Sequence, residues 1–173
     1  MVIRKAKLTD LDQIEMIYNE IHDAEEKGKM KIGWDRSIYP TRRTARQGID
    51  EDDLFVLEDD GQIVGSAIIN QKQAHCYCNA HWRYPADDDE VMVLHTLVIS
   101  PSVRGKGYGR AFEAYYENYA KDHHCRSLRI DTNYNNKVAR AFYKKLGYEE
   151  IDVIPTTFNG ISGVNLVCLE KKL

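Results

Sequence analysis

The 173-residue chain has no long run of apolar residues. Its apolar runs are short, as in Val91-Met92-Val93-Leu94, whereas a membrane-spanning helix needs about 20 apolar residues in sequence. The N-terminal stretch Met-Val-Ile-Arg-Lys-Ala-Lys also lacks the apolar core of a signal peptide. The sequence therefore predicts neither a membrane span nor a secretory leader.

Cysteine is also scarce, and its spacing forms no familiar pattern. The four cysteines include no C-x-x-C pair and form no dense framework; they are Cys76, Cys78, Cys125 and Cys168. Small secreted domains that depend on disulfides are much richer in cysteine. We therefore expect a reducing, cytoplasmic setting.

Charge of one sign is not in excess. Acidic residues number 27 against 24 basic ones, which gives a formal net charge of −3. Such a chain has no bulk attraction to nucleic acid or to an anionic membrane, so any anion site must be local. With 43% hydrophobic and 29% charged residues, the composition is that of a globular protein, and the length suits a single domain over residues 1–173.

Periodicity and turn residues predict a mixed α/β domain. We expect helices that begin at Thr9, Thr41, Tyr108 and Asn135 or Asn136, the first with a Thr9–Asp12 capping box and the last ending at Gly147. Asp59-Asp60-Gly61 predicts a hairpin turn, and residues 71–89 are expected to be irregular. The expected strands are 2–7, 54–58, 62–70, 91–99, 128–132, 148–154 and 164–169.

A glycine-rich loop follows the strand predicted at 91–99 and leads into a helix. It reads Arg104-Gly105-Lys106-Gly107-Tyr108-Gly109-Arg110. Glycines let a ligand approach the backbone, and a helix N-terminus offers unpaired N–H groups with a partial positive charge. With three cations nearby, the loop predicts a site for a phosphate or pyrophosphate. A flexible turn with solvated charges is the alternative.

Neither of two common phosphate-binding motifs fits this loop. The Rossmann fingerprint needs Gly or Ala three residues after its second Gly, and counting from Gly105 and Gly107 that position is Arg110. The Walker A motif needs a second Gly five residues after its first, and from Gly105 that position is again Arg110.

Two stretches of the chain together carry a family resemblance. Arg104 to Gly109 fits an R/Q-x-x-G-x-G/A loop, preceded by the strand Leu94–Ile99 and by Pro101-Ser102-Val103. Further along, Asn136-x-x-Ala139-x-x-x-Tyr143 is followed by Lys145-Leu146-Gly147-Tyr148. Both stretches, at this separation, resemble the GNAT superfamily of acyl-CoA N-acyltransferases. The resemblance implies a twisted, mostly antiparallel central sheet of about seven strands with helices on both faces.

The resemblance also implies how acetyl-CoA, the expected cosubstrate, would be held. It would sit in a V between two diverging central strands, and strand backbone at Leu97, Val98 and Ile99 would bond its pantetheine arm. Asn136 would also contact it, and the Leu97 amide is the expected donor to the oxyanion. The pyrophosphate would be bound by the loop residues Arg104, Gly105, Lys106, Gly107, Tyr108, Gly109 and Arg110.

Two residues are candidates for the catalytic proton transfers. Tyr143 occupies the family's usual general-acid position, beside the bound cofactor, and a phenol can protonate a leaving thiolate. His95 is the candidate base, because imidazole titrates near neutral pH and this residue interrupts an apolar strand. The alternatives are a core tyrosine and a core histidine bonded to a backbone carbonyl, with a chain of water molecules as the base.

Aromatic residues in the loops before the strand at 91–99 are candidates for the acceptor pocket. Among them, Trp34, Tyr39 and Trp82 would suit a small amine with an apolar body. The same residues could instead cover the sheet or form a dimer contact. The run from His75 to His81, which includes Cys76 and Cys78, matches no standard zinc spacing, so we expect no metal.

These features predict an N-acetyltransferase in which the primary amine of a small molecule attacks acetyl-CoA directly within a ternary complex. The first alternative is acetylation of protein or peptide amines, which an open groove would support. The second is a non-catalytic CoA-binding regulatory module. Neither nucleic acid nor a membrane is an expected partner, and a homodimer is left open.

Overall fold

One seven-stranded sheet organises the computed structural model, which describes all 173 residues. The strand order is β1-β2-β3-β4-β5-β7-β6, and every neighbouring pair is antiparallel except β4 and β5, which are parallel. The mostly antiparallel sheet implied by the resemblance is therefore confirmed. The strands are β1 (Val2–Lys5), β2 (Leu54–Asp59), β3 (Gln62–Asn70), β4 (Val91–Ile99), β5 (Ser127–Asn133), β6 (Glu149–Phe158) and β7 (Ile161–Lys172).

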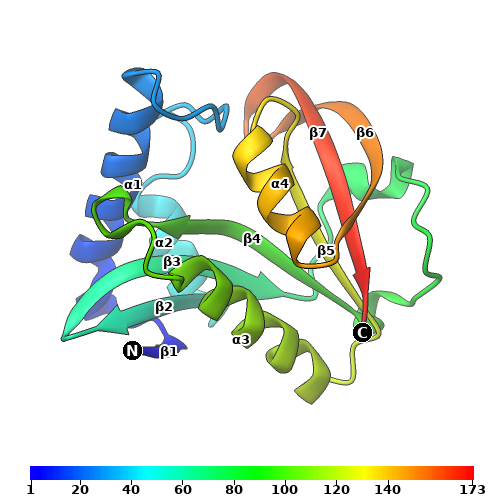
Figure 1. Cartoon of the computed structure of the whole chain (residues 1–173), viewed down its shortest axis with the longest axis horizontal. Helices are drawn as coiled ribbons and strands as arrows, with labels where there is room; N and C mark the ends of the chain where they lie inside the picture. The colour runs from blue at the N-terminus through cyan, green and yellow to red at the C-terminus, as the bar shows by residue number, and fades with distance from the viewer.

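Helices cover both faces of the sheet, as expected (Figure 1). On one face lie α1 (Leu11–Glu26) and α2 (Arg42–Asp50); on the other lie α3 (Tyr108–Asp122) and α4 (Lys137–Lys145). The apolar run of β2 is continuous because both faces of the sheet are covered and successive side chains point to opposite faces. Leu54 and Val56 pack with α1, whereas Phe55 and Leu57 pack with α3. None of the four helices is long and apolar enough to cross a membrane.

Several element ends differ from the sequence expectations. The Thr9–Asp12 capping box is absent: a 3₁₀ turn over Leu8–Asp10 precedes α1, and the Asp10 carboxylate accepts the Lys7 N–H at 2.7 Å and pairs with Arg4. Strands β6 and β7 are longer than predicted, because they pair through to their connecting turn.

Three predicted turn and cap positions are confirmed. Asp60 and Gly61 have the positive φ values of a tight hairpin, 48° and 75°. Asn136 caps the N-terminus of α4, and Gly147, with a φ of 90°, follows its end. The irregular stretch 71–89 contains two 3₁₀ turns, His75–Asn79 and Asp88–Glu90.

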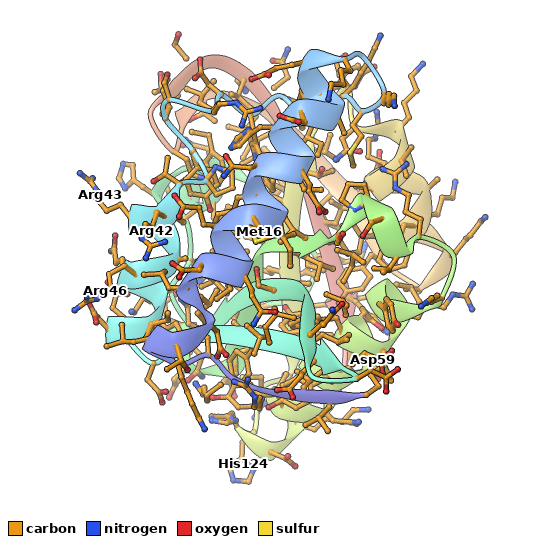
Figure 2. The ribbon with its side chains drawn as sticks, turned by 90° about the vertical axis from the view of Figure 1, so that its left-hand side faces the viewer. Met16, Arg42, Arg43, Arg46, Asp59 and His124 are labelled. Carbon is orange, nitrogen blue, oxygen red and sulfur yellow. The ribbon has the colours of Figure 1, made fainter.

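Exposed ion pairs connect α1 and α2 above the apolar cluster that both helices share. Arg42 at the start of α2 pairs with Asp12 at 2.7 Å and with Glu15 at 2.5 Å, both on α1. Figure 2 shows the arginines of α2 projecting outward and Met16 on the outer side of α1. Because both helices are anchored on one face of the sheet, the segment that joins them, residues 27–41, begins and ends on that face.

The sheet opens in its middle, between β4 and β5. These strands pair only from Val91 and Ser127 to Leu94 and Ile130, although both continue for several residues. On the other edge of β4, the register with β3 shifts between the Ile68–His95 and Ser66–Val98 pairs, which marks a β-bulge. Thr96, inside the bulge, has a φ of 51°. A bulge bends its strand, so β4 turns away from β5 and leaves the predicted V.

Candidate functional site

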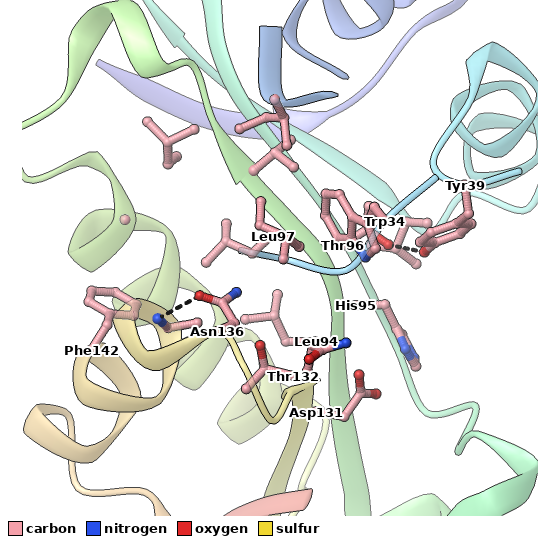
Figure 3. A pocket seen from close by; sticks show the side chains of 18 of the residues that line it. Trp34, Tyr39, Leu94, His95, Thr96, Leu97, Asp131, Thr132, Asn136 and Phe142 are labelled. Atoms are coloured by element: carbon pink, nitrogen blue, oxygen red, sulfur yellow. Dashed lines mark hydrogen bonds between the residues drawn. The ribbon is translucent and has the colours of Figure 1, made fainter. Parts of the chain in front are cut away.

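The V opens into a cavity of about 1030 Å³ (Figure 3). Residues from β4, the glycine loop, α4 and the α1–α2 segment line it. It therefore unites side chains that are far apart in the sequence. Nearly all the predicted site residues meet here: Trp34, Tyr39, His95, Leu97, Val98, Ile99, Arg104, Gly105, Lys106, Gly107, Tyr108, Gly109, Arg110, Asn136 and Tyr143.

The glycine loop combines an open backbone, a helix N-terminus and cations without ion pairs. Gly105 and Gly107 have φ values of 86° and 82°, which side chains strain to adopt, and no atom lies within 4 Å of the position of an added Cβ at either. Gly107 caps α3, whose first N–H groups have no acceptor within the helix. The cations of the loop, on Arg104, Lys106 and Arg110, form no ion pair within the chain.

The strand backbone beside the V is only partly free. Ser100 N–H donates to Val64 on β3, so Val98, two residues earlier, also turns its backbone groups toward β3, where it pairs with Ser66. By the alternation of a strand, Ile99 turns its backbone groups toward the side that β5 has left. Leu97 lies inside the bulge, between the His95 and Val98 pairs, where this alternation is interrupted. The structure thus makes backbone groups available at Ile99 but not at Val98.

On α4, Asn136 and Tyr143 face the cavity. The Asn136 Oδ1 accepts the Ala139 N–H at 3.1 Å, which leaves its amide NH₂ as a donor. Tyr143 is only 6% exposed and packs edge-on against Tyr148, with ring centroids 5.6 Å apart. Burial raises the pKa of Tyr143 well above its usual value, so the phenol keeps its proton at neutral pH and has a proton to donate.

His95 lines the cavity and is also tied to the backbone. Its Nε2 lies 3.1 Å from the Lys72 carbonyl oxygen, which can only accept, so Nε2 carries the proton and Nδ1 does not. Burial lowers the pKa of His95 to about 4. The imidazole is therefore neutral at pH 7 and a weak proton acceptor. A carbonyl bond of this kind is what the core-histidine alternative expects, and the role of His95 as base stays a prediction.

The α1–α2 segment brings two aromatic residues to the cavity. Trp34 and Tyr39 pack edge to face, with ring centroids 5.9 Å apart and planes at 83°. The Tyr39 hydroxyl hydrogen-bonds the Thr96 hydroxyl, which ties the segment to the bulge of β4. Glu25 at the end of α1 accepts the N–H groups of Ile32 and Gly33 at 2.9 and 2.7 Å. The segment is thus held at several points along its length.

The same segment reaches across to the far side of the V. A Cβ added to Gly33 would lie 2.3 Å from the Asn133 side-chain amide nitrogen at the end of β5, so a side chain there would force Asn133 to move and would also strain a φ of 82°. A Cβ added to Gly160, in the β6–β7 turn, would lie 3.0 Å from Ile38. Residues 33–39 therefore come close to the end of β5 and to the β6–β7 turn, and they cover part of the cavity from the α1 side.

A comparison with known proteins agrees with this geometry. The acetyltransferase (GNAT) family model matches residues 14–148. The chain belongs to this family. It is therefore an acetyltransferase, and the GNAT loop and late helix inferred from the sequence both lie within the matched region.

Individual GNAT relatives have low sequence identity to this chain, but their matches cover most of it. An N-acetyltransferase of Methanocaldococcus jannaschii is 29% identical over 158 residues, a match that spans 88% of this chain and 62% of the relative. A GNAT acetyltransferase structure from Streptococcus agalactiae has a TM-score of 0.83 at 22% identity, covering 99% of this chain and 95% of that one. YncA of Salmonella typhimurium, solved with its cofactor acetyl-CoA, has a TM-score of 0.70 at 19% identity, with 100% and 94% covered.

One predicted acceptor residue lies outside the cavity of this GNAT enzyme. The Trp82 indole N–H donates to the Tyr77 carbonyl at 2.9 Å, and its ring centroid lies 4.1 Å from the Arg129 guanidinium. Trp82 therefore packs against the 3₁₀ turn at His75–Asn79 and does not line the cavity. His81 pairs with Asp152 at 2.8 Å, and no three His, Cys, Asp or Glu side chains are grouped as metal ligands.

Sequence reasoning missed one residue that the GNAT site contains. Asp131 on β5 lines the cavity, and its Oδ2 accepts a hydrogen bond from the Tyr77 hydroxyl at 2.7 Å. Burial raises the pKa of Asp131 to about 6. The signal that singled out His95, a titratable side chain in a buried strand, was also present at Asp131 between Ile130 and Thr132.

Proposed function

We propose that this GNAT enzyme transfers the acetyl group of acetyl-CoA to the primary amine of a small molecule by direct attack in a ternary complex. The observation that carries the proposal is that the cavity has lining residues on both sides of β4. In Figure 3, Leu97, Asn136 and Phe142 lie on one side of β4, and Trp34, Tyr39 and His95 lie on the other. Donor and acceptor can thus be bound together and meet at the bulge.

The residues on the first side fit acetyl-CoA. The unpaired cations of the glycine loop and the free N–H groups at the start of α3 suit its pyrophosphate. The backbone groups of Ile99 suit the amides of its pantetheine arm, and the Asn136 NH₂ can add a donor. When bound, acetyl-CoA supplies a thioester whose carbonyl carbon is open to an amine. The YncA complex supports this choice of donor.

Two groups of the chain suit the charges that develop during transfer. The Leu97 N–H stays the predicted donor to the acetyl carbonyl oxygen, where negative charge accumulates. Tyr143 can protonate the departing thiolate, because its buried phenol holds its proton at neutral pH. His95 stays the predicted base on the acceptor side: its Nδ1 is unprotonated, although a pKa of about 4 makes it a weak acceptor.

The covered acceptor side supports a small molecule rather than a protein chain. A polypeptide needs a groove that it can enter along its length, whereas residues 33–39 contact the end of β5 and the β6–β7 turn. The space beneath is lined by aromatic and aliphatic side chains, among them Trp34, Phe158 and Ile161. Such a pocket suits an amine with a compact apolar body.

Calorimetric titration with acetyl-CoA, with CoA and ATP as comparison ligands, tests the donor. We expect binding of acetyl-CoA and CoA that weakens more than about tenfold in Gly107→Val, because a side chain both strains the φ of 82° and enters the loop. Gly61→Val is the matched control: its φ is 75° and its Cβ also meets nothing, but it lies in the β2–β3 turn. Absence of binding to either CoA form would refute the proposed donor.

Release of the CoA thiol in the presence of candidate amines tests the acceptor. Small primary amines and peptides with free N-termini or lysines would be compared at equal concentration. We expect turnover with small amines. Turnover with peptides alone would instead favour a protein acetyltransferase, and binding of acetyl-CoA without any turnover would favour a regulatory module.

A further inference from the structure

Asp131 is a carboxylate without a cation. No ion pair of the chain includes it, and its one hydrogen-bond donor is the neutral Tyr77 hydroxyl. Five titratable side chains from the surrounding elements lie near Asp131, and all are uncharged at neutral pH. They are Cys76 and Tyr77 of the 3₁₀ turn, Cys168 of β7, Tyr39 of the α1–α2 segment and Tyr143 of α4.

The other acidic residues of the cavity differ from Asp131 in this respect. Glu51 and Asp53 lie toward α2, and the Lys72 ammonium pairs with them at 2.7 and 2.8 Å. Each of them therefore has a cationic partner, the shared Lys72 ammonium, whereas Asp131 has none. Because an unpaired carboxylate is costly in a desolvated site, Asp131 is the position where a bound cation would be stabilised most.

We propose that Asp131 binds the ammonium group of the acceptor and then accepts a proton from it, and that the acceptor is a primary alkylamine or arylalkylamine with a single cationic head. The assignment rests on the proposed function and names its substrate class. Trp34, Phe158 and Ile161 would contact the apolar body. A second ammonium group would find no unpaired carboxylate in the cavity.

The position of Asp131 suits both the binding of the ammonium group and the transfer of its proton. In Figure 3 its side chain projects from β5 toward the side of β4 that carries His95 and Trp34. The Tyr77 hydroxyl occupies Oδ2 and leaves Oδ1 for a ligand. Burial, followed by the charge of Asp131, raises the pKa of Tyr143, so the carboxylate lies within electrostatic reach of the predicted acid. An ammonium at Oδ1 would therefore be close to the V where the thioester is expected.

Asp131 is also the stronger of the two proton acceptors in the pocket. Burial raises the pKa of Asp131 to about 6 and lowers the pKa of His95 to about 4. At pH 7 Asp131 is ionised, attracts the ammonium and can take its proton, whereas neutral His95 has no charge to offer.

The proton balance of the step is complete with these groups. The amine nitrogen forms a bond to the acetyl carbonyl carbon, and the carbon–sulfur bond of the thioester breaks. Two protons leave the nitrogen: the first passes to Asp131 and on to solvent, and the second restores the proton that Tyr143 gives to the thiolate. The products are the amide, CoA thiol and one released proton.

The first test is binding of the phenethylammonium ion, measured by calorimetry without acetyl-CoA. We expect binding to the wild-type protein that weakens at least tenfold in Asp131→Asn, which keeps the size of the side chain and an acceptor for Tyr77. Asp152→Asn is the matched control, because Asp152 is also a hydrogen-bonded carboxylate of the sheet but pairs with His81 outside the cavity. Equal binding by both variants, or no binding to the wild type, would overturn the proposal.

The second test is the pH profile of kcat/KM for phenethylamine acetylation. We expect an acidic limb near pH 6 that is absent in Asp131→Asn, whose rate falls by about 10²-fold or more. His95→Gln should keep the limb. Tyr77→Phe should move it to higher pH, because the Tyr77 hydroxyl holds the pKa of Asp131 down. Tyr77→Phe leaves the carboxylate in place and gives a second, independent readout of the same titration.

The two tests separate this assignment from the proposed function. If the limb near pH 6 persists in Asp131→Asn and disappears in His95→Gln, His95 is the base and the assignment of Asp131 is wrong. If the wild-type protein fails to bind acetyl-CoA, the proposed function fails, yet the phenethylammonium titration still decides whether Asp131 binds a cation.

Discussion

Replacing Glu170 by glutamine should destabilise the protein strongly, although the side chain keeps its size. Glu170 on β7 is fully buried and pairs with Arg129 on β5, itself only 4% exposed, with Oε1 and Nε 3.3 Å apart. The same carboxylate accepts the Ser127 hydroxyl at 3.0 Å and the Arg83 N–H at 2.8 Å. The substitution would leave the Arg129 guanidinium buried without its counter-charge.

The expected size of the effect follows from that burial. Removing one partner of a buried pair costs about 3–5 kcal/mol, because the remaining charge is uncompensated. For a domain of this length, each kcal/mol lowers Tm by roughly 2–4 °C, so Tm should fall by about 6–20 °C. Glu150→Gln is the control. Its ion pair with Arg140 is short, at 2.7 Å, but partly exposed, and its loss should cost less than about 1 kcal/mol.

Urea unfolding followed by circular dichroism, with thermal unfolding beside it, measures both effects. The double variant with Arg129→Met should recover part of the loss, because no buried charge then remains unpaired. Arg129 also stacks on Trp82, which bonds the Tyr77 carbonyl, so amine turnover should fall in Glu170→Gln even well below its Tm. A change in unfolding free energy below about 1 kcal/mol would refute the reasoning.

Three further outcomes are expected. Tyr143→Phe should lower kcat by about 10²-fold or more with acetyl-CoA affinity unchanged by calorimetry; an unchanged kcat would remove its role as acid. Asp131→Asn should raise the unfolding free energy at pH 7.5 by on the order of 2 kcal/mol, because a carboxyl whose pKa is raised to about 6 destabilises the folded state above that pH. In urea unfolding this gain should vanish near pH 4. An equal gain at both pH values would contradict the prediction. Gly33→Ala should raise KM for the amine several-fold through its clash with Asn133, whereas Gly28→Ala, at a φ of 69° with open space, should not.

The elements of the fold could be predicted because their signals are local. The apolar stripe of α1, the hairpin residues Asp60 and Gly61, and the glycine after α4 each act within a few residues of chain. The ends of β6 and β7 were misjudged because their outer residues pair with each other across the hairpin, and the added segments contain Pro155 and Gly163, residue types that are depleted in strands.

Within the site, the residues found from sequence belong to contiguous motifs. The glycine loop, the Asn136 cap and Tyr143 depend on helix termini and on spacing along one helix, which the sequence displays directly. Trp82 was assigned to the pocket because it is aromatic and in a loop, a property that does not say which way a side chain turns. Asp131 was missed because it is a single acidic residue within a strand and belongs to no contiguous motif.

By itself, the sequence determined the family, the order of elements and the position of the glycine loop, since each follows from local backbone preferences or from a contiguous motif. Tertiary structure alone decided the rest. The bulge at Thr96 and the short β4–β5 ladder open the V, and the close approach of Gly33 to Asn133 covers one side of the cavity. Burial then moves the pKa values of His95 and Asp131 in opposite directions, because desolvation disfavours the charged form of each, and no local pattern records how much water a side chain loses.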